Sequence, residues 1–328
     1  MFKHKIQYHP DGSLKHLLTI EGLSKKHMQA IFDSAKNISN PALRDALPKH
    51  LNAIIATLFY EPSTRTRTTF DIAAQKLQAH VVNLTVSSSS AQKGETLRDT
   101  VQNLAAMQTN VIILRHSSSG AAHFVAEQTP DFVSVINAGD GCHAHPTQAL
   151  LDMYTIQQHV QDFTTLSVAI IGDIAHSRVA RSQIHALTTL GVPDIRIIGP
   201  KTLLPAELSS LGVTLYPDLQ SGLKGVEVVL LLRLQQERMQ SGNLPIGDYY
   251  YRHYGLTEQT LQYANPTALV MHPGPLNRGV EIQSELADGT KALILKQVTN
   301  SISVRMAIID MLINNQAINQ KINHQGKK

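Results

Sequence analysis

The segment richest in groups that bind anions is the run Phe59-Tyr60-Glu61-Pro62-Ser63-Thr64-Arg65-Thr66-Arg67-Thr68. It leaves an apolar stretch and enters a stretch with helical spacing of apolar residues, which predicts a helix N-terminus. The first turn of a helix offers unpaired N–H groups and about half a positive charge. With four hydroxyls and two arginines added, these donors suit a phosphate. An ordinary Ser or Thr helix cap explains less, because a cap needs only one of these side chains.

Other kinds of site are weaker explanations of the motifs in this chain. The run at Ser63 is not a Walker A loop, because it has neither the glycines nor the Gly-Lys-Ser/Thr ending. Gly172-Asp173-Ile174 follows an apolar stretch, but no G-x-G-x-x-G is present, so a plain strand-to-helix turn explains it. His143 and His145 would point opposite ways in a strand, and no third ligand cluster accompanies them, so we expect no metal. Cys142 is expected to be a small buried residue rather than a nucleophile.

Apolar bursts of strand length alternate with longer stretches of helical period. Most bursts are rich in Val, Ile and Leu without polar alternation, which is typical of parallel strands buried on both faces. The pattern predicts an α/β fold of the doubly wound class, with helices between the strands. The predicted strands are 53–60, 80–86, 111–115, 132–137, 167–172, 195–199, 212–216, 226–232 and 268–272.

The length of 328 residues predicts two domains, at roughly 150 residues each. We place them at residues 1–150 and 151–298, with the junction in a helix that opens at Pro146, a favoured first helical residue. A final helix, about Thr299 to Asn314, should return to the first domain and complete it with residues 299–328. The polar residues after Asn314 are expected to fray. The active site is expected in a cleft between two doubly wound parallel-sheet domains.

Arginines follow several of the predicted strands. Arg115 ends one strand, Arg178 lies a few residues after the strand that ends at Gly172, and Arg233 directly follows another. Ligands of open α/β sheets bind beyond the carboxyl ends of the strands. These positions therefore favour an anion site over an exposed charged loop.

Composition limits the classes of function. The net charge is +4, but the basic residues are dispersed and aromatic residues make up only 5%, so we expect no nucleic-acid partner. No apolar run approaches the ~20 residues of a membrane span, and the N-terminus has no apolar core of a secretion signal. One cysteine excludes an intrachain disulfide. We expect a cytoplasmic protein without membrane partners.

The chain also resembles a known family, the aspartate and ornithine carbamoyltransferases. The run at Ser63 is similar to the family's S-T-R-T-R carbamoyl-phosphate motif, and further segments match in order over essentially the whole chain. These segments are Lys93-Gly94-Glu95-Thr96, Leu114-Arg115-His116, His145-Pro146-Thr147-Gln148, Gly172-Asp173-Ile174 with Ser177-Arg178, Arg233-Leu234-Gln235-Gln236-Glu237-Arg238, and His272-Pro273-Gly274-Pro275-Leu276-Asn277-Arg278-Gly279.

The later motifs favour the aspartate branch of this family. Ornithine enzymes resemble one another in an Asp-x-x-x-Ser-Met-Gly segment and a His-Cys-Leu-Pro loop, and this chain has neither. Arginines at 233 and 238 suit a dicarboxylate, because guanidinium pairs with carboxylate in a bidentate fork. The resemblance thus implies carbamoyl transfer from carbamoyl phosphate to L-aspartate, the first committed step of pyrimidine synthesis. The alternatives are another amino acceptor such as ornithine or an N-acylated derivative, and a non-catalytic phosphate-binding module.

The resemblance also implies roles for individual residues. Carbamoyl phosphate would be bound by Ser63, Thr64, Arg65, Thr66, Arg115, His145, Gln148, Pro273 and Gly274, with Ser89 and Lys93 of a neighbouring subunit. The catalytic residues among them would be Arg65, Thr66, Arg115 and His145. Aspartate would be bound by Lys93, Arg178, Arg233 and Gln235. A clamp would join Glu61 to Arg178 and Arg238 and hold the domains closed.

The shared site requires an oligomer, which the resemblance implies is a homotrimer, and no metal or organic cofactor is expected. Gly274 replaces a leucine of the shorter His-Pro-Leu-Pro-Arg loop found in enterobacterial enzymes. The longer loop is similar to a branch whose trimers associate with dihydroorotase-like chains. Dihydroorotase-like or regulatory chains are therefore possible partners.

Overall fold

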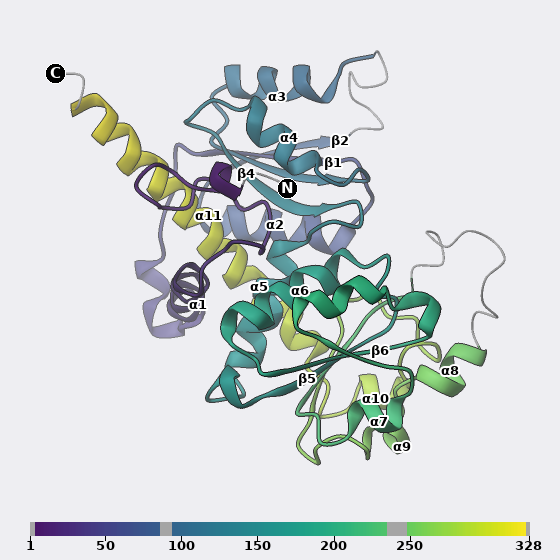
Figure 1. The fold of residues 1–328 in the computed structure, drawn as a ribbon. Coiled ribbons are helices and arrows are strands. Elements are labelled where there is room, and N and C mark those ends of the chain that lie inside the picture. The colour runs from purple at the N-terminus through teal and green to yellow at the C-terminus, as the bar shows by residue number, and fades with distance from the viewer. Residues whose placement is uncertain (1–3, 86–93, 235–247, 326–328) are drawn as a thin grey trace. The chain divides into compact units, whose positions relative to one another are not determined.

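The computed structural model describes residues 4–85, 94–234 and 248–325 (Figure 1). The chain forms two compact units, Met1–Thr147 with Asn300–Lys328, and Gln148–Thr299. Within the described residues, no helix is both long and apolar enough to cross a bilayer.

The first unit is built on a parallel four-stranded sheet in the order β2-β1-β3-β4. The central strands pair in register from Ile55 with Val111 to Phe59 with Arg115, so both end at the same edge of the sheet. Three of the strands are almost fully buried, as apolar sequence predicts, whereas the edge strand at His80–Thr85 carries exposed residues such as Val82, which is 40% exposed. They are β1 (Ile54–Phe59), β2 (His80–Thr85), β3 (Val111–His116) and β4 (Ser134–Asp140).

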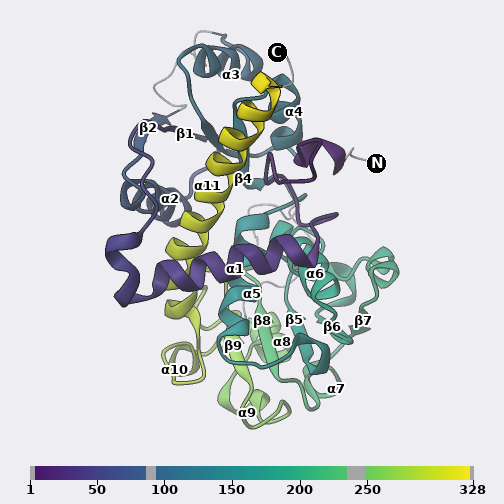
Figure 2. The ribbon, with the colours of Figure 1, turned by 90° about the vertical axis from the view of Figure 1, so that its left-hand side faces the viewer.

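Helices cover both faces of this sheet (Figures 1 and 2). Helices α3 (Leu97–Ala106) and α4 (Ala121–Gln128) share an apolar core with alternate residues of β1, β3 and β4. Helices α2 (Thr64–Lys76) and α11 (Ile294–Gln325) lie on the opposite face, where the Arg305 guanidinium stacks 4.8 Å from the Phe70 ring centre. The first helix, α1, spans Lys25–Ser39.

The second unit has a parallel five-stranded sheet in the order β7-β6-β5-β8-β9. Its strands are β5 (Ser167–Ile171), β6 (Asp194–Ile198), β7 (Thr214–Tyr216), β8 (Val228–Leu231) and β9 (Leu269–Met271). One face packs against the short helices α7 (Leu219–Leu223), α9 (Glu258–Leu261) and α10 (Ser284–Ala287) in a single apolar core. The remaining helices are α5 (Pro146–Gln157), α6 (Arg178–Leu190) and α8 (Asp248–Tyr254). Single 3-10 turns occur at His4–Gln7, Pro41–Ala46, Phe163–Thr165, Lys201–Leu203 and Ala206–Leu211.

The prediction of an α/β, doubly wound fold with two parallel sheets is confirmed, and all nine expected strands are present. The predicted bounds of the last helix were wrong, since α11 begins at Ile294 and continues to Gln325. Its polar distal part is held by side-chain hydrogen bonds, from Asn315 Nδ2 to the Leu14 carbonyl and from Gln316 Nε2 to Ser134 Oγ. Met107, which directly follows the end of α3, is 67% exposed.

The chain segment before α1 is tied to β4 through a buried histidine. The Nδ1 atom of His16 accepts a hydrogen bond from the Val135 N–H at 2.9 Å, and the side chain is inaccessible to solvent. Burial holds the pKa of His16 well below its usual value, and nearby Lys15 lowers the pKa further. The folded protein therefore keeps this imidazole neutral where the unfolded chain protonates it.

This difference predicts the pH dependence of stability. Below pH ~6.5 the unfolded chain binds a proton at His16 that the folded chain does not, so stability falls as the pH falls. We expect the melting temperature of wild-type protein to drop more steeply between pH 7 and pH 5 than that of His16→Gln, whose amide oxygen can still accept from Val135. Differential scanning calorimetry across this range measures both slopes. Equal slopes would contradict the assignment.

Candidate functional site

The predicted anion-binding residues of the first unit lie beyond the carboxyl ends of β1, β3 and β4. The strand order reverses between β1 and β3, and such a switch point leaves a crevice at the carboxyl edge. Ser63 follows β1, while Arg115 lies at the end of β3. His145 follows β4 and precedes α5. Sheet topology alone therefore brings these three positions to one edge.

The N-terminus of α2 carries the hydroxyl-rich motif. Ser63 occupies the N-cap position, but its side chain makes no capping hydrogen bond. Thr64 is exposed, Arg65 is half-buried and Thr66 is buried. Thr69 Oγ1 donates back to the Arg65 carbonyl at 2.8 Å, so this hydroxyl stabilises the first turns of the helix instead. The first N–H groups of α2 therefore receive no hydrogen bond from a Ser63 cap, and such groups at a helix N-terminus can bind an anion.

Arg115 is held at the end of β3 by protein groups. Its Nη1 donates to the Ala138 carbonyl at 3.1 Å, and its Nη2 lies 3.5 Å from Glu61 Oε2. The Arg115 carbonyl accepts from the Tyr60 N–H, which fixes the two strand ends together. The predicted clamp partner of Glu61, Arg238, lies outside the described residues. The Glu61–Arg115 ion pair is a contact that sequence spacing did not predict.

The loop that leads to His145 is organised by the buried Asp140. This carboxylate accepts from the N–H groups of Gly120 and Ala144 and from Asn137 Nδ2, at 2.7 to 3.1 Å. His145 itself is 5% exposed and directly precedes α5. Anchoring of this kind holds an irregular loop rigid without regular secondary structure. Asp140 was not among the predicted site residues.

In the second unit the strand order reverses between β5 and β8, and the predicted acceptor-binding arginines flank this point. Arg178 is the first residue of α6, and the Ser177 side chain caps that helix by accepting from the Ala180 N–H. Arg233 follows β8 and is half-buried. Gly172 directly follows β5 with φ +137°, and a Cβ there would lie 2.9 Å from the Leu232 Cβ. Only glycine allows the two strand ends to approach this closely.

The loop at residues 272–279 is joined to the segment after β8 by another buried carboxylate. Glu281 Oε1 accepts from the Leu234 N–H at 2.9 Å and from Asn277 Nδ2, while Oε2 accepts from the Asn277 N–H. Burial raises the pKa of Glu281, and these N–H donors oppose the rise. Pro273 and Gly274 are half-exposed. Glu281 was not predicted from the sequence. The one signal for its burial is its position between the apolar residues Val280 and Ile282.

The structure places the predicted residues in two groups, one in each unit. Ser63, Thr64, Arg65, Thr66, Arg115 and His145 belong to the first unit, and Gln148, Arg178, Arg233, Pro273 and Gly274 to the second. Ser89, Lys93, Gln235 and Arg238 lie outside the described residues. In the ranges 4–85, 94–234 and 248–325, no three His, Cys, Asp or Glu side chains gather as metal ligands would.

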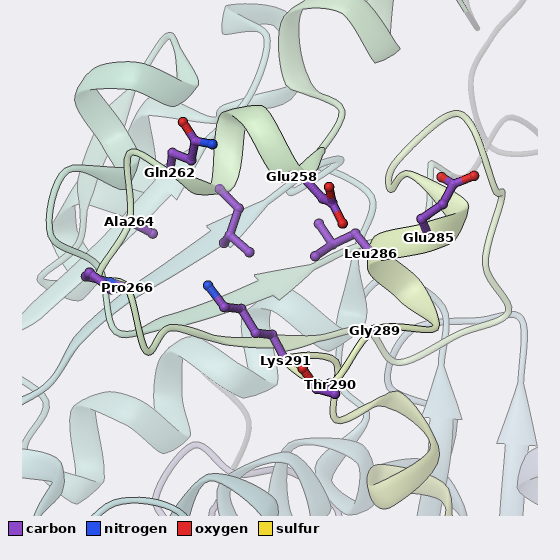
Figure 3. A pocket seen from close by; sticks show the side chains of 10 residues that line it. Glu258, Gln262, Ala264, Pro266, Glu285, Leu286, Gly289, Thr290 and Lys291 are labelled. Carbon is purple, nitrogen blue, oxygen red and sulfur yellow. The ribbon is translucent and has the colours of Figure 1, made fainter.

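A pocket of about 450 Å³ opens elsewhere in the second unit, between α9 and α10 (Figure 3). Its lining consists of apolar side chains together with the charged side chains of Lys291, Glu258 and Glu285. None of the predicted site residues belongs to this pocket.

Comparison with known proteins assigns the chain to a family. The aspartate/ornithine carbamoyltransferase carbamoyl-P binding domain matches residues 15–158, and the Asp/Orn binding domain of the same family matches residues 164–312. The chain belongs to the aspartate/ornithine carbamoyltransferase family. It therefore transfers the carbamoyl group of carbamoyl phosphate to an amino acid acceptor, aspartate or ornithine.

Solved structures of both kinds of enzyme are similar to this chain. Aspartate transcarbamoylase from Trypanosoma cruzi with carbamoyl aspartate and phosphate is 27% identical, with a TM-score of 0.81 over 91% of this chain and 96% of that one. The same enzyme with N-(phosphonacetyl)-L-aspartic acid is 27% identical, with a TM-score of 0.82 over 93% and 98%. Ornithine carbamoyltransferase from Pyrococcus furiosus is 23% identical, with a TM-score of 0.80 over 92% and 97%, a likeness of fold.

The contacts of Glu281 predict its contribution to stability. Glu281→Ala would leave the N–H groups of Leu234 and Asn277 without their acceptor, and each buried unsatisfied donor costs about 1–3 kcal/mol. We expect the free energy of unfolding, measured in urea, to fall by about 2–4 kcal/mol. The matched control is Glu258→Ala, an exposed glutamate of the same unit, which should change it by less than ~1 kcal/mol. A similar effect of both substitutions would contradict the anchoring role.

Proposed function

We propose that this member of the family is an aspartate carbamoyltransferase. It transfers the carbamoyl group of carbamoyl phosphate to the amino group of L-aspartate, giving N-carbamoyl-L-aspartate and phosphate, the first committed step of pyrimidine synthesis. The reaction forms one C–N bond and breaks the bond between the carbonyl carbon and the phosphate oxygen.

The observation that carries this choice of acceptor is the charge at the switch point of the second sheet. Arg178 and Arg233 flank it, and each can pair with one carboxylate of a dicarboxylic acid. An ornithine side chain is cationic and would be repelled there. The sequence has no His-Cys-Leu-Pro loop and no Ser-Met-Gly segment, which ornithine enzymes share. The T. cruzi relatives, solved with aspartate-derived ligands, support the same acceptor.

The first unit would hold the phosphate and stabilise charge at the carbonyl. In this proposal Ser63, Thr64 and Arg65 bind the phosphate with the N–H groups of α2, joined by Ser89 and Lys93 from a neighbouring subunit. Preorganised donors near a developing oxyanion lower the barrier because they need no reorganisation. The donors assigned to the carbonyl oxygen are Thr66, Arg115 and His145.

The second unit would bind the NH2 of the carbamoyl group and the acceptor aspartate. Gln148 and the carbonyls of Pro273 and Gly274 are assigned to the carbamoyl NH2. Arg178, Arg233, Gln235 and Lys93 are assigned to the two carboxylates of aspartate. The departing phosphate can take the proton of the attacking amine, so no side chain has to serve as the base.

Residues 1–150, completed by 299–328, would form the carbamoyl-phosphate domain, and residues 151–298 the aspartate domain. The site would lie in the cleft between them. The assignment of Ser89 and Lys93 to a neighbouring site requires an oligomer, and the resemblance to the family implies that it is a homotrimer. The clamp of Glu61 with Arg178 and Arg238 would hold the closed state, in which Glu61 leaves its pairing with Arg115.

One assay tests the acceptor. Purified protein is incubated with carbamoyl phosphate and either L-aspartate or L-ornithine, and phosphate release is followed. We expect turnover with aspartate and at least about 100-fold less with ornithine. Arg233→Met should lower kcat/KM for aspartate by about 100-fold, because it removes a charge-assisted pair worth about 2–5 kcal/mol.

The matched control is Arg252→Met, an arginine of the same unit whose side chain is 74% exposed and which should keep wild-type activity. Turnover with ornithine alone would sink the proposed acceptor, and turnover with neither would contradict both acceptors.

A further inference from the structure

The second unit contains a carboxylate that no solvent reaches and that three glutamine side chains surround. Asp152 lies on α5, and Gln148 Nε2, one helical turn before it, donates to Asp152 Oδ1 at 2.9 Å. Gln297 Nε2 from α11 donates to the same oxygen at 2.7 Å, and Gln183 Nε2 from α6 donates to Oδ2 at 2.7 Å. Both carboxylate oxygens are paired in this way, while the buried Oε1 of Gln183 has no hydrogen-bond partner among the residues that the structure describes.

The chemistry of a carboxylate decides how each amide is turned. An ionised carboxylate only accepts hydrogen bonds, whereas a glutamine amide has an NH2 donor at one side and a carbonyl acceptor at the other. Each glutamine therefore turns its NH2 toward Asp152 and its carbonyl oxygen away. The opposite orientation would set two acceptors against each other in a buried place. In the described part of the chain, no hydrogen-bond donor reaches Gln148 Oε1, so this oxygen remains available to a ligand.

Gln297 connects Asp152 to the loop after β9 through further hydrogen bonds. Its Oε1 accepts from the His272 N–H at 3.0 Å, and His272 Nδ1 in turn accepts from the Gly274 N–H at 2.7 Å. The second bond requires an unprotonated Nδ1, so the imidazole is neutral with its proton on Nε2. The Gly274 N–H lies in one peptide plane with the Pro273 carbonyl, so its hydrogen bond sets the direction of that carbonyl and holds the loop at Gly274 in place.

We propose that Asp152 is the positioning residue that gives the site its preference for a carbamoyl NH2. Through Gln148 it presents a side-chain carbonyl, and through Gln297 and His272 it holds the loop that presents the backbone carbonyls of Pro273 and Gly274. The inference rests on the proposed function, in which these three carbonyls receive the NH2 group. It adds that one buried carboxyl group orders all three.

The proposal predicts a measurable selectivity between carbamoyl phosphate and acetyl phosphate, which have almost the same shape. Carbamoyl phosphate carries an NH2 where acetyl phosphate carries a methyl group. A site built to accept hydrogen bonds rejects an analogue without the donor, because its acceptors are left unpaired. A site without oriented acceptors would bind both ligands through the phosphate and the carbonyl alone.

Asp152→Asn tests the proposal. Asparagine keeps the shape but has one accepting oxygen, so its own NH2 faces a glutamine and forces that amide to turn or to lose its bond. Dissociation constants for carbamoyl phosphate and acetyl phosphate are measured by calorimetry on the full chain. We expect binding of carbamoyl phosphate to weaken at least about tenfold and binding of acetyl phosphate to change less than about twofold.

The matched control is Asp194→Asn, which alters another carboxylate network of the second unit, with Arg196 and Ser167, and should leave the ratio of the two constants unchanged. Equal weakening of both ligands in Asp152→Asn, or an unchanged ratio, would overturn the proposal. If Asp152→Asn does not fold, Gln297→Met decides, since it frees the His272 N–H and should weaken carbamoyl phosphate severalfold while sparing acetyl phosphate.

The wild-type protein separates this inference from the proposed function. Wild type that binds the two phosphates equally would contradict the assignment of the NH2 acceptors. Wild type that prefers carbamoyl phosphate, with Asp152→Asn that keeps the preference, would contradict only the role of Asp152.

Discussion

The constraint on which this structure depends is that parallel strands buried on both faces can expose polar chemistry only where they end. In both units the central strands are largely apolar, and residues able to bind anions follow the buried positions, directly at Arg115 and Arg233 and after a few residues at Ser63. The reversal of strand order then opens a place for a ligand between two adjacent strand ends. Ser63 and Arg115 flank that place in one unit, and Arg178 and Arg233 flank it in the other.

Irregular loops follow these strands, and buried carboxylates hold several of them. Asp140 anchors the loop before His145, Glu281 joins the segment at Leu234 to the loop at Asn277, and Asp152 orders three glutamines. In each case the carboxylate accepts from several N–H groups, which compensates for the loss of its hydration. The hydrogen bonds to these carboxylates also pair loop N–H groups that have no partner in regular secondary structure. Loops fixed in this way can present donors and acceptors to a ligand without rearranging.

The fold could be read from the sequence because its signals are local. Runs such as Val111–Leu114 and Val168–Ile171 are continuous and apolar, so they predict buried parallel strands without knowledge of their neighbours. Arginines that follow these strand ends are then predicted to bind a ligand. The long-range contacts gave no such signal: Asp152 meets Gln297 across 145 positions of sequence, and only the fold brings them together. The length of α11 was missed for the same reason, because its polar end is held by distant partners such as Ser134.

In the proposed reaction one set of donors binds a phosphate while a second set binds a dicarboxylate. Calorimetric titration with N-(phosphonacetyl)-L-aspartic acid, a ligand of the T. cruzi relative, tests both sets in one molecule. We expect this ligand to bind at least about 100-fold more tightly than the matching N-(phosphonacetyl)-L-ornithine. Equal binding of the two, or tighter binding of the ornithine compound, would contradict the proposed reaction.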